Sequence, residues 1–136
     1  MNRKLLKYIF SILLIAILIF VFHSCGKTHA RSGRPVTLTC KIYGSDICVT
    51  LPDEEAEKVI AIMDGNTYST DFLGFPSCGF DKNVSLKIGN RIYAIAGDSC
   101  NTVVNWRTGR YFYIAQEDME YIHELFQKYG ADFPWI

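Results

Sequence analysis

The sequence predicts a small α+β domain, in which a single antiparallel sheet has two helices packed on one face, in the order β-β-α-β-β-β-β-β-α. Several segments alternate apolar and polar residues with a period of two, which is typical of half-buried strands. Two other segments repeat apolar residues at helical spacing, and hairpin-length connections join the strands. With 136 residues, the chain is long enough for one hydrophobic core and too short for two.

The first two strands are predicted at residues 36–42 and 47–51, where apolar side chains alternate with polar ones. A helix follows, because Thr50 offers a capping hydroxyl and Pro52 suits the first helical turn. The acidic residues after Pro52 favour the positive end of the helix dipole. Gly65 is expected to end this helix.

The second half of the chain is predicted to contain mostly strands. A helix over residues 117–129 closes the domain, since its apolar residues recur at helical spacing and Gly130 follows it. The predicted strands of this half lie at residues 67–72, 84–88, 91–96, 102–106 and 110–114.

The strands at residues 84–88 and 91–96 form the clearest hairpin. Pairing Ile88 with Ile92 would place all their apolar residues on one face, and we expect this register. The Gly89-Asn90 dipeptide instead favours a two-residue loop, so the expected register requires a bulge.

The N-terminus has the features of an export segment. Arg3, Lys4 and Lys7 precede an apolar run from Tyr8 to Phe22, as in the charged and hydrophobic regions of a signal peptide. This run is shorter than the roughly 20 residues of a spanning helix. No large apolar side chain follows until Val36, which predicts a flexible tether. The predicted division is a signal peptide or membrane anchor at 1–24, a tether at 25–34 and one globular domain at 35–136.

The end of this segment resembles the lipobox of small bacterial envelope lipoproteins. Ser24 and Gly26 match that pattern around Cys25, whereas Phe22 and His23 stand where the family has Leu and a small residue. The resemblance implies lipidation of Cys25 at the outer side of a bacterial cell membrane. An uncleaved anchor and plain secretion are the alternatives, and all three place the domain outside the cytoplasm.

Four further cysteines predict disulfides in an exported domain. Cys78 and Cys100 are expected to pair, because both lie on a common face near the open end of the hairpin. The simplest register of the first two strands is unfavourable for a bridge between Cys40 and Cys48, since Cys40 lies on the apolar face of its strand and Cys48 does not. Either a bulge permits a Cys40–Cys48 bridge or both thiols stay free.

Evidence for catalysis is limited to one resemblance. Gly97-Asp98-Ser99 follows an apolar strand and resembles the nucleophile block of GDS-type ester hydrolases, and Glu120 with His123 resembles that family's late acid-x-x-His block. The resemblance implies Ser99 as nucleophile and His123 as its base. A turn beside a disulfide is the favoured interpretation, because the family usually has Leu where Cys100 stands. No cofactor or metal site is predicted, since neither C-x-x-C nor H-x-x-x-H occurs.

Charge and aromatic content narrow the expected function. Three of the 14 basic residues precede residue 25, which leaves 11 against 14 acidic ones and argues against a nucleic-acid binder. The later strands are rich in aromatic side chains, which suit protein interfaces. We therefore expect a non-enzymatic module that recognises a protein partner, such as an inhibitor, an immunity-type protein or an envelope-complex component. A small hydrolase using Ser99 and His123 is the alternative. The candidate contact residues are Tyr93, Trp106, Tyr111 and Tyr113.

Overall fold

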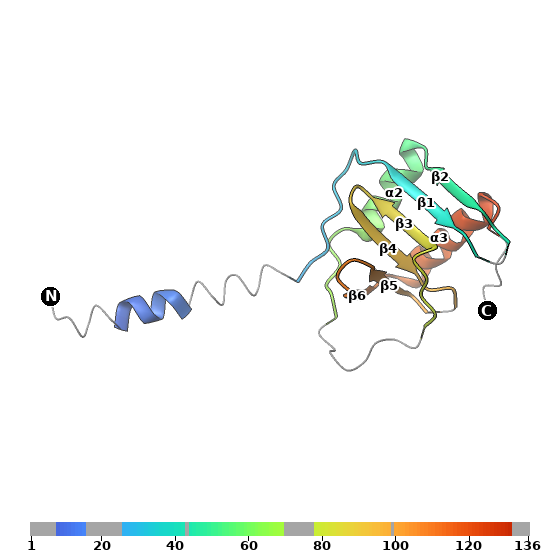
Figure 1. The fold of residues 1–136 in the computed structure, drawn as a ribbon. Helices are drawn as coiled ribbons and strands as arrows, with labels where there is room; N and C mark the ends of the chain where they lie inside the picture. Colours follow the sequence, from blue (N-terminus) through green and yellow to red (C-terminus); the bar gives the residue numbers. More distant parts are fainter. Residues whose placement is uncertain (1–7, 16–25, 43, 70–77, 99, 132–136) are drawn as a thin grey trace.

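The computed structural model describes residues 8–15, 26–42, 44–69, 78–98 and 100–131. Its centre is a six-stranded antiparallel sheet with the strand order β2-β1-β3-β4-β5-β6 (Figure 1). The strands are β1 (Val36–Cys40), β2 (Ile47–Thr50), β3 (Val84–Ile88), β4 (Arg91–Ile95), β5 (Thr102–Asn105) and β6 (Tyr111–Tyr113). The predicted α+β class is thereby confirmed.

One predicted strand is not found where the structure describes it. Of the segment 67–72, Thr67 forms a single bridge with Lys27, residues 68 and 69 belong to no strand, and residues 70–72 lie outside the described ranges. The described sheet therefore has one strand fewer than expected.

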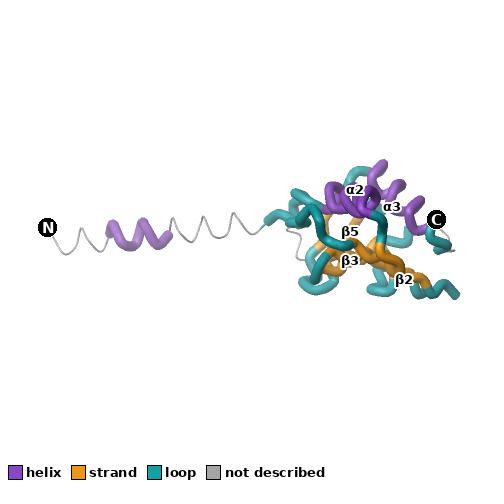
Figure 2. The backbone as a smooth tube through the Cα atoms, turned by 90° about the horizontal axis from the view of Figure 1, so that it is seen from above, coloured by secondary structure: helices purple, strands orange, loops and turns teal. Residues whose placement is uncertain are grey.

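Two helices belong to the domain, α2 (Asp53–Met63) and α3 (Gln116–Lys128). Figure 2 shows both helices on the same side of the strands. Acidic residues occupy the first turn of each helix, where they face the positive end of the helix dipole. The predicted hydroxyl cap is absent, because Pro52 holds the capping position of α2 and no side chain there makes a capping hydrogen bond.

The main core lies between the sheet and these helices. Val36, Leu38 and Cys40 of β1 are fully buried and alternate with half-buried Thr37 and Thr39. They share one cluster with the buried residues of α2 and α3. Burying a side chain of this size contributes roughly 1.5–3 kcal/mol. We call the face of the sheet that carries Leu38 the helix-facing side and the opposite face the outer face.

The hairpin of β3 and β4 has a two-residue loop. Gly89-Asn90 connects the strands directly, and Ile88 pairs with Arg91. The expected pairing of Ile88 with Ile92 is therefore wrong by one residue. Gly89 has a φ of 58°, the left-handed conformation that such a tight turn requires. The shift places Tyr93 on the helix-facing side of the sheet.

The segment predicted as a flexible tether is docked on the domain wherever the structure describes it, over residues 26–34. Thr28 is fully buried, and its backbone N–H donates to the carbonyl of Asn66 over 2.8 Å. In return, the backbone N–H of Asn66 donates to the Thr28 hydroxyl over 2.8 Å. Tyr68 donates its backbone N–H to the carbonyl of Gly26, also over 2.8 Å. The prediction of a flexible tether rested on the lack of large apolar side chains. It is wrong for residues 26–34, because hydrogen bonds attach this segment to the domain without apolar burial.

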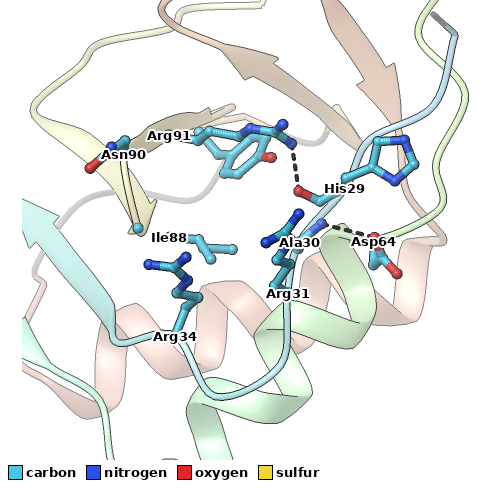
Figure 3. A pocket seen from close by; sticks show the side chains of 10 residues that line it. His29, Ala30, Arg31, Arg34, Asp64, Ile88, Asn90 and Arg91 are labelled. Carbon is cyan, nitrogen blue, oxygen red and sulfur yellow. Dashed lines mark hydrogen bonds between the residues drawn. The ribbon is translucent and has the colours of Figure 1, made fainter.

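Two further contacts fix the middle of this docked segment (Figure 3). The backbone N–H of Ala30 donates to Oδ1 of Asp64 over 2.8 Å, just beyond the end of α2. The guanidinium of Arg91 donates to the carbonyl of His29. The docked segment therefore joins the end of α2 to the beginning of β4.

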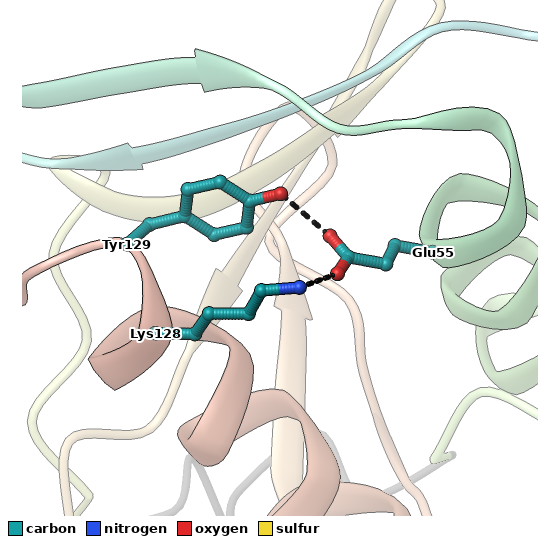
Figure 4. A network of polar contacts seen from close by, with 3 residues as sticks. All are labelled: Glu55, Lys128 and Tyr129. Carbon is teal, nitrogen blue, oxygen red and sulfur yellow. Dashed lines mark hydrogen bonds and ion pairs between the residues drawn. The ribbon is translucent and has the colours of Figure 1, made fainter.

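A polar cluster joins the two helices (Figure 4). The Glu55 carboxylate of α2 accepts hydrogen bonds from the Lys128 ammonium and, over 2.7 Å, from the Tyr129 hydroxyl. The hydrogen bond from Lys128 holds the pKa of Glu55 below its usual value, which burial partly opposes. This cluster ties the start of α2 to the end of α3.

A separate helix occupies residues 8–15, and its apolar side chains are exposed. Tyr8 is 71 % exposed and Phe10 is 69 % exposed. Among the described residues, no helix combines the length and the hydropathy that crossing a membrane requires.

Candidate functional site

The outer face of the sheet carries two exposed aromatic side chains, one at each end of the pair formed by strands β5 and β6. Trp106 is 43 % exposed and Tyr113 is 54 % exposed. Tyr113 pairs with Thr102 at the far end of β6. Trp106 follows β5 and continues the sheet pattern, because its backbone N–H donates to the carbonyl of Ile92 over 2.9 Å. We call Trp106 and Tyr113 the aromatic pair.

A second buried cluster lies between these two residues and contacts Tyr113. Ala94, Val104 and Tyr111 form a second buried cluster on the outer face, with Phe80 against it. The rings of Tyr111 and Tyr113 meet edge to face, with centroids 5.8 Å apart. Aromatic residues held in this way lose little conformational entropy when a partner binds.

The turn between β5 and β6 is fixed by one buried side chain. Asn105 donates from Nδ2 to the Tyr68 hydroxyl over 3.0 Å and accepts the Arg107 backbone N–H over 3.2 Å. The Arg110 guanidinium lies over the Tyr68 ring, 4.5 Å from its centroid. These contacts hold the backbone on both sides of Trp106.

The four predicted contact residues do not lie together. Tyr111 is on the outer face but only 4 % exposed, so it supports Tyr113 without forming surface. Tyr93 is fully buried on the helix-facing side, where its ring meets Phe112 edge to face. Tyr93 therefore cannot contact a partner on the outer face, and the one-residue register shift of the hairpin is the reason.

The cysteines form one of the two predicted bridges. Cys78 and Cys100 are joined by a disulfide, as predicted. Cys40 and Cys48 are both free, which decides between the two alternatives left open for them. Cys40 pairs with Ile47, and Cys48 pairs with Thr39, which puts the two thiols on opposite faces of the sheet. Cys25, the predicted lipidation site, lies outside the described residues.

The residues of the hydrolase alternative are described only in part. Ser99 lies outside the described residues, while His123 is half-buried on α3 and Glu120 is exposed on the same helix. Burial lowers the pKa of His123, against opposing effects of a hydrogen bond with the Ala96 backbone and of the Asp98 charge. A thiol nucleophile at Cys100 is excluded, because its sulfur is bonded to Cys78. The Ser99–His123 hydrolase stays a prediction.

One cluster among the described residues has the composition of a metal site. Ligand atoms of Cys78, Asp98 and Cys100 lie within 4.8 Å of one another. The two sulfur atoms are joined in the disulfide, and Asp98 accepts the backbone N–H of Cys100 over 3.0 Å. This cluster therefore offers a metal ion no thiolate.

Sequence reasoning missed a pocket of about 720 Å³ beside the docked segment. Arg31 and Arg34 of that segment line it, together with Arg91 at the start of β4. The signal in the sequence is positional: every arginine after residue 25 falls before β1, at the β3–β4 turn or at the β5–β6 turn. Antiparallel pairing brings these three places to one end of the sheet. We call it the arginine end.

No protein-family model, curated protein or solved structure matches this chain. The arguments about function therefore rest on the geometry of the chain itself.

Proposed function

We propose that the protein is a membrane-tethered extracytoplasmic binding module, without enzymatic activity, which recognises a protein partner through the outer face of β5 and β6. The observation that carries this proposal is the exposure of Trp106 and Tyr113 on a sheet whose backbone and supporting side chains are fixed. Tyrosine and tryptophan are the side chains most enriched at the centres of protein interfaces. A rigid strand platform lets them bind without first being ordered.

The tether has its own support. The helix at residues 8–15 presents apolar side chains that are between 52 % and 71 % exposed, and a lipid phase would remove them from water. The basic residues before this helix favour a cytoplasmic N-terminus, which leaves the domain on the other side. Lipidation of Cys25 is one form of this tether, and an uncleaved anchor is the other.

Site-specific photo-crosslinking of the full chain in its native membranes tests the partner proposal. A photoreactive phenylalanine derivative replaces Tyr113 in one sample and Glu124 in the other; Glu124 is exposed on α3, on the helix side of the domain. We expect position 113 to give a discrete protein adduct and position 124 to give none. Adding Trp106→Ala should reduce the adduct at least about tenfold, since an anchor residue of an interface contributes about 2 kcal/mol or more.

Two results would contradict the proposal. Equal labelling from positions 113 and 124 would show that the outer face contacts proteins no more specifically than the helix side does. Adducts with lipid alone at position 113 would make the aromatic pair a membrane contact in place of a protein interface.

A further inference from the structure

The pocket at the arginine end has the composition of an anion site. Arg31, Arg34 and Arg91 line it together with a single carboxylate, Asp64, and its volume is about 720 Å³. Figure 3 shows the arginines arriving from two elements, Arg31 and Arg34 from the docked segment and Arg91 from β4. The stem of Arg34 passes the hairpin turn, since a Cβ placed on Gly89 would lie 4.0 Å from its Cδ.

The arginines of this pocket form no ion pair among the described residues. The ion pairs among the described residues join Lys41 to Asp46 and Lys128 to Glu55, and they leave the three pocket arginines uncompensated. Arg91 uses one donor for the carbonyl of His29, and a guanidinium has five.

Tyr93 supplies an independent observation. Its side chain lines the pocket and is fully buried, yet its hydroxyl has no hydrogen-bond partner among the described residues. A buried hydroxyl without a partner costs free energy that a bound acceptor would recover. Burial raises the pKa of this phenol, which the nearby Arg91 side chain partly offsets, so the hydroxyl remains a neutral donor in the physiological range.

Phosphate is the anion that this donor set suits best. Guanidinium groups bind phosphate oxygens through paired, charge-assisted hydrogen bonds, and a phosphate offers oxygens in several directions to arginines arriving from different elements. The Asp64 carboxylate is already engaged, because it accepts the Ala30 N–H over 2.8 Å. The positive charges therefore outnumber the negative one at the opening.

The position of the pocket points to the source of that phosphate. Gly26 is hydrogen-bonded to the domain, and His29 lines the pocket. Four residues of extended chain from Cys25 to His29 span at most about 14 Å. We propose that the arginine pocket binds a phosphate-bearing anion, namely the headgroup of an anionic phospholipid in the membrane that holds the protein. The choice of a lipid over free phosphate rests on the tether part of the proposed function.

Nitrogen NMR of the arginine side chains tests this proposal on the full chain in maltoside micelles, which contain no phosphate. Inorganic phosphate is titrated in one arm. In the other arm, phosphatidylglycerol is added to the micelles in phosphate-free buffer. We expect saturable shifts of the Arg31, Arg34 and Arg91 side-chain signals with phosphatidylglycerol, while Arg107 and Arg110 serve as internal references. Shifts with inorganic phosphate alone would keep the anion site and overturn the lipid source.

Three variants sharpen the result. Arg31→Gln or Arg34→Gln should weaken phosphatidylglycerol binding about tenfold, whereas Lys82→Gln removes the same charge at the opposite end and should change it less than about twofold. Tyr93→Phe should weaken binding severalfold and change the melting temperature little, because among the described residues its hydroxyl makes no hydrogen bond of good geometry.

The proposal is overturned if neither phosphate source shifts the pocket signals beyond those of Arg107. It is also overturned if Lys82→Gln weakens binding as much as Arg34→Gln, since that would indicate general charge attraction. The inorganic phosphate arm needs no membrane, and the crosslinking at position 113 needs no pocket, so each proposal can fail without the other.

Discussion

The two free thiols lie on neighbouring strands and in opposite environments. Cys48 is exposed on β2, at the edge of the sheet, and Cys40 is fully buried on β1. Burial raises the pKa of the Cys40 thiol, which a hydrogen bond with the Ile42 backbone partly offsets. Because the thiolate is the reactive form, both access and ionisation disfavour reaction at Cys40.

Labelling with a maleimide, followed by peptide mapping, should show this contrast. We expect Cys48 to react in the native protein, and Cys40 to react at a comparable rate only after denaturation. Cys48→Ser should leave the native domain without a labelled peptide from β1 or β2. Comparable native labelling of Cys40 would show that β1 opens, and resistance of both residues would indicate a bridge between them.

At the scale of elements, the docked segment depends on one side chain of α2. Glu57 accepts the Gly33 backbone N–H over 2.6 Å and the Ser32 hydroxyl over 2.7 Å. The hydrogen bond from Gly33 is the main reason that the pKa of Glu57 lies below its usual value. The beginning of the segment is held differently, through the buried Thr28 and the loop after α2.

Amide hydrogen exchange should separate these two attachments. Glu57→Ala should accelerate exchange at Gly33 by about tenfold, because the Gly33 N–H would lose its charge-assisted acceptor. Exchange at Thr28 should not change. Glu54→Ala is the matched control, since Glu54 is an exposed acid of the same helix. Equal acceleration at Thr28 would mean that the segment detaches as one unit.

The hairpin shows where sequence reasoning stops. Alternation located both strands, but β4 is apolar on each face, with Ile92 and Ala94 on one and Tyr93 and Ile95 on the other. An apolar pattern cannot choose a register in such a strand, and the backbone conformation of Gly89 does. The turn chemistry was visible in the sequence and carried the decisive information.

The candidate site was predictable to a similar degree. Trp106 and Tyr113 follow from aromatic residues around a short hairpin, which the sequence displays directly. Tyr93 was misplaced by the register. The arginine pocket was missed because its members are far apart in sequence and meet only when the sheet order is known. The disulfide between Cys78 and Cys100 was predicted, although the register used to argue for it is shifted.

For the whole molecule, different cysteines determine the covalent cross-link and the predicted anchoring: Cys78 and Cys100 form the disulfide, and Cys25 is the predicted lipidation site. One disulfide closes a sequence separation of 22 residues between Cys78 and Cys100. Such a bridge contributes roughly 2–4 kcal/mol by restricting the unfolded chain. That is a large part of the stability of a domain of about 100 residues.

Intact mass of the membrane-extracted protein, with and without reductant, tests both features. Reduction should add about 2 Da, for the two hydrogens of one disulfide, whereas two bridges would add about 4 Da. Lipidation predicts a chain that starts at Cys25 and carries the additional mass of a diacylglycerol group. The full-length mass without lipid would establish the uncleaved anchor, and an unmodified chain starting after the apolar run would remove the tether.

The docking of residues 26–34 also bears on how the protein would meet a partner. A lipidated Cys25 would directly precede Gly26, which is hydrogen-bonded to the domain. The linker between the lipid anchor and the domain would therefore be very short. The domain could then neither swing out from the bilayer nor tumble freely, and its arginine end would stay turned towards the lipid. The outer face, which carries Trp106 and Tyr113, would point along the membrane plane while the protein diffuses. The search for a second membrane-bound protein would then be two-dimensional, with the binding face already oriented.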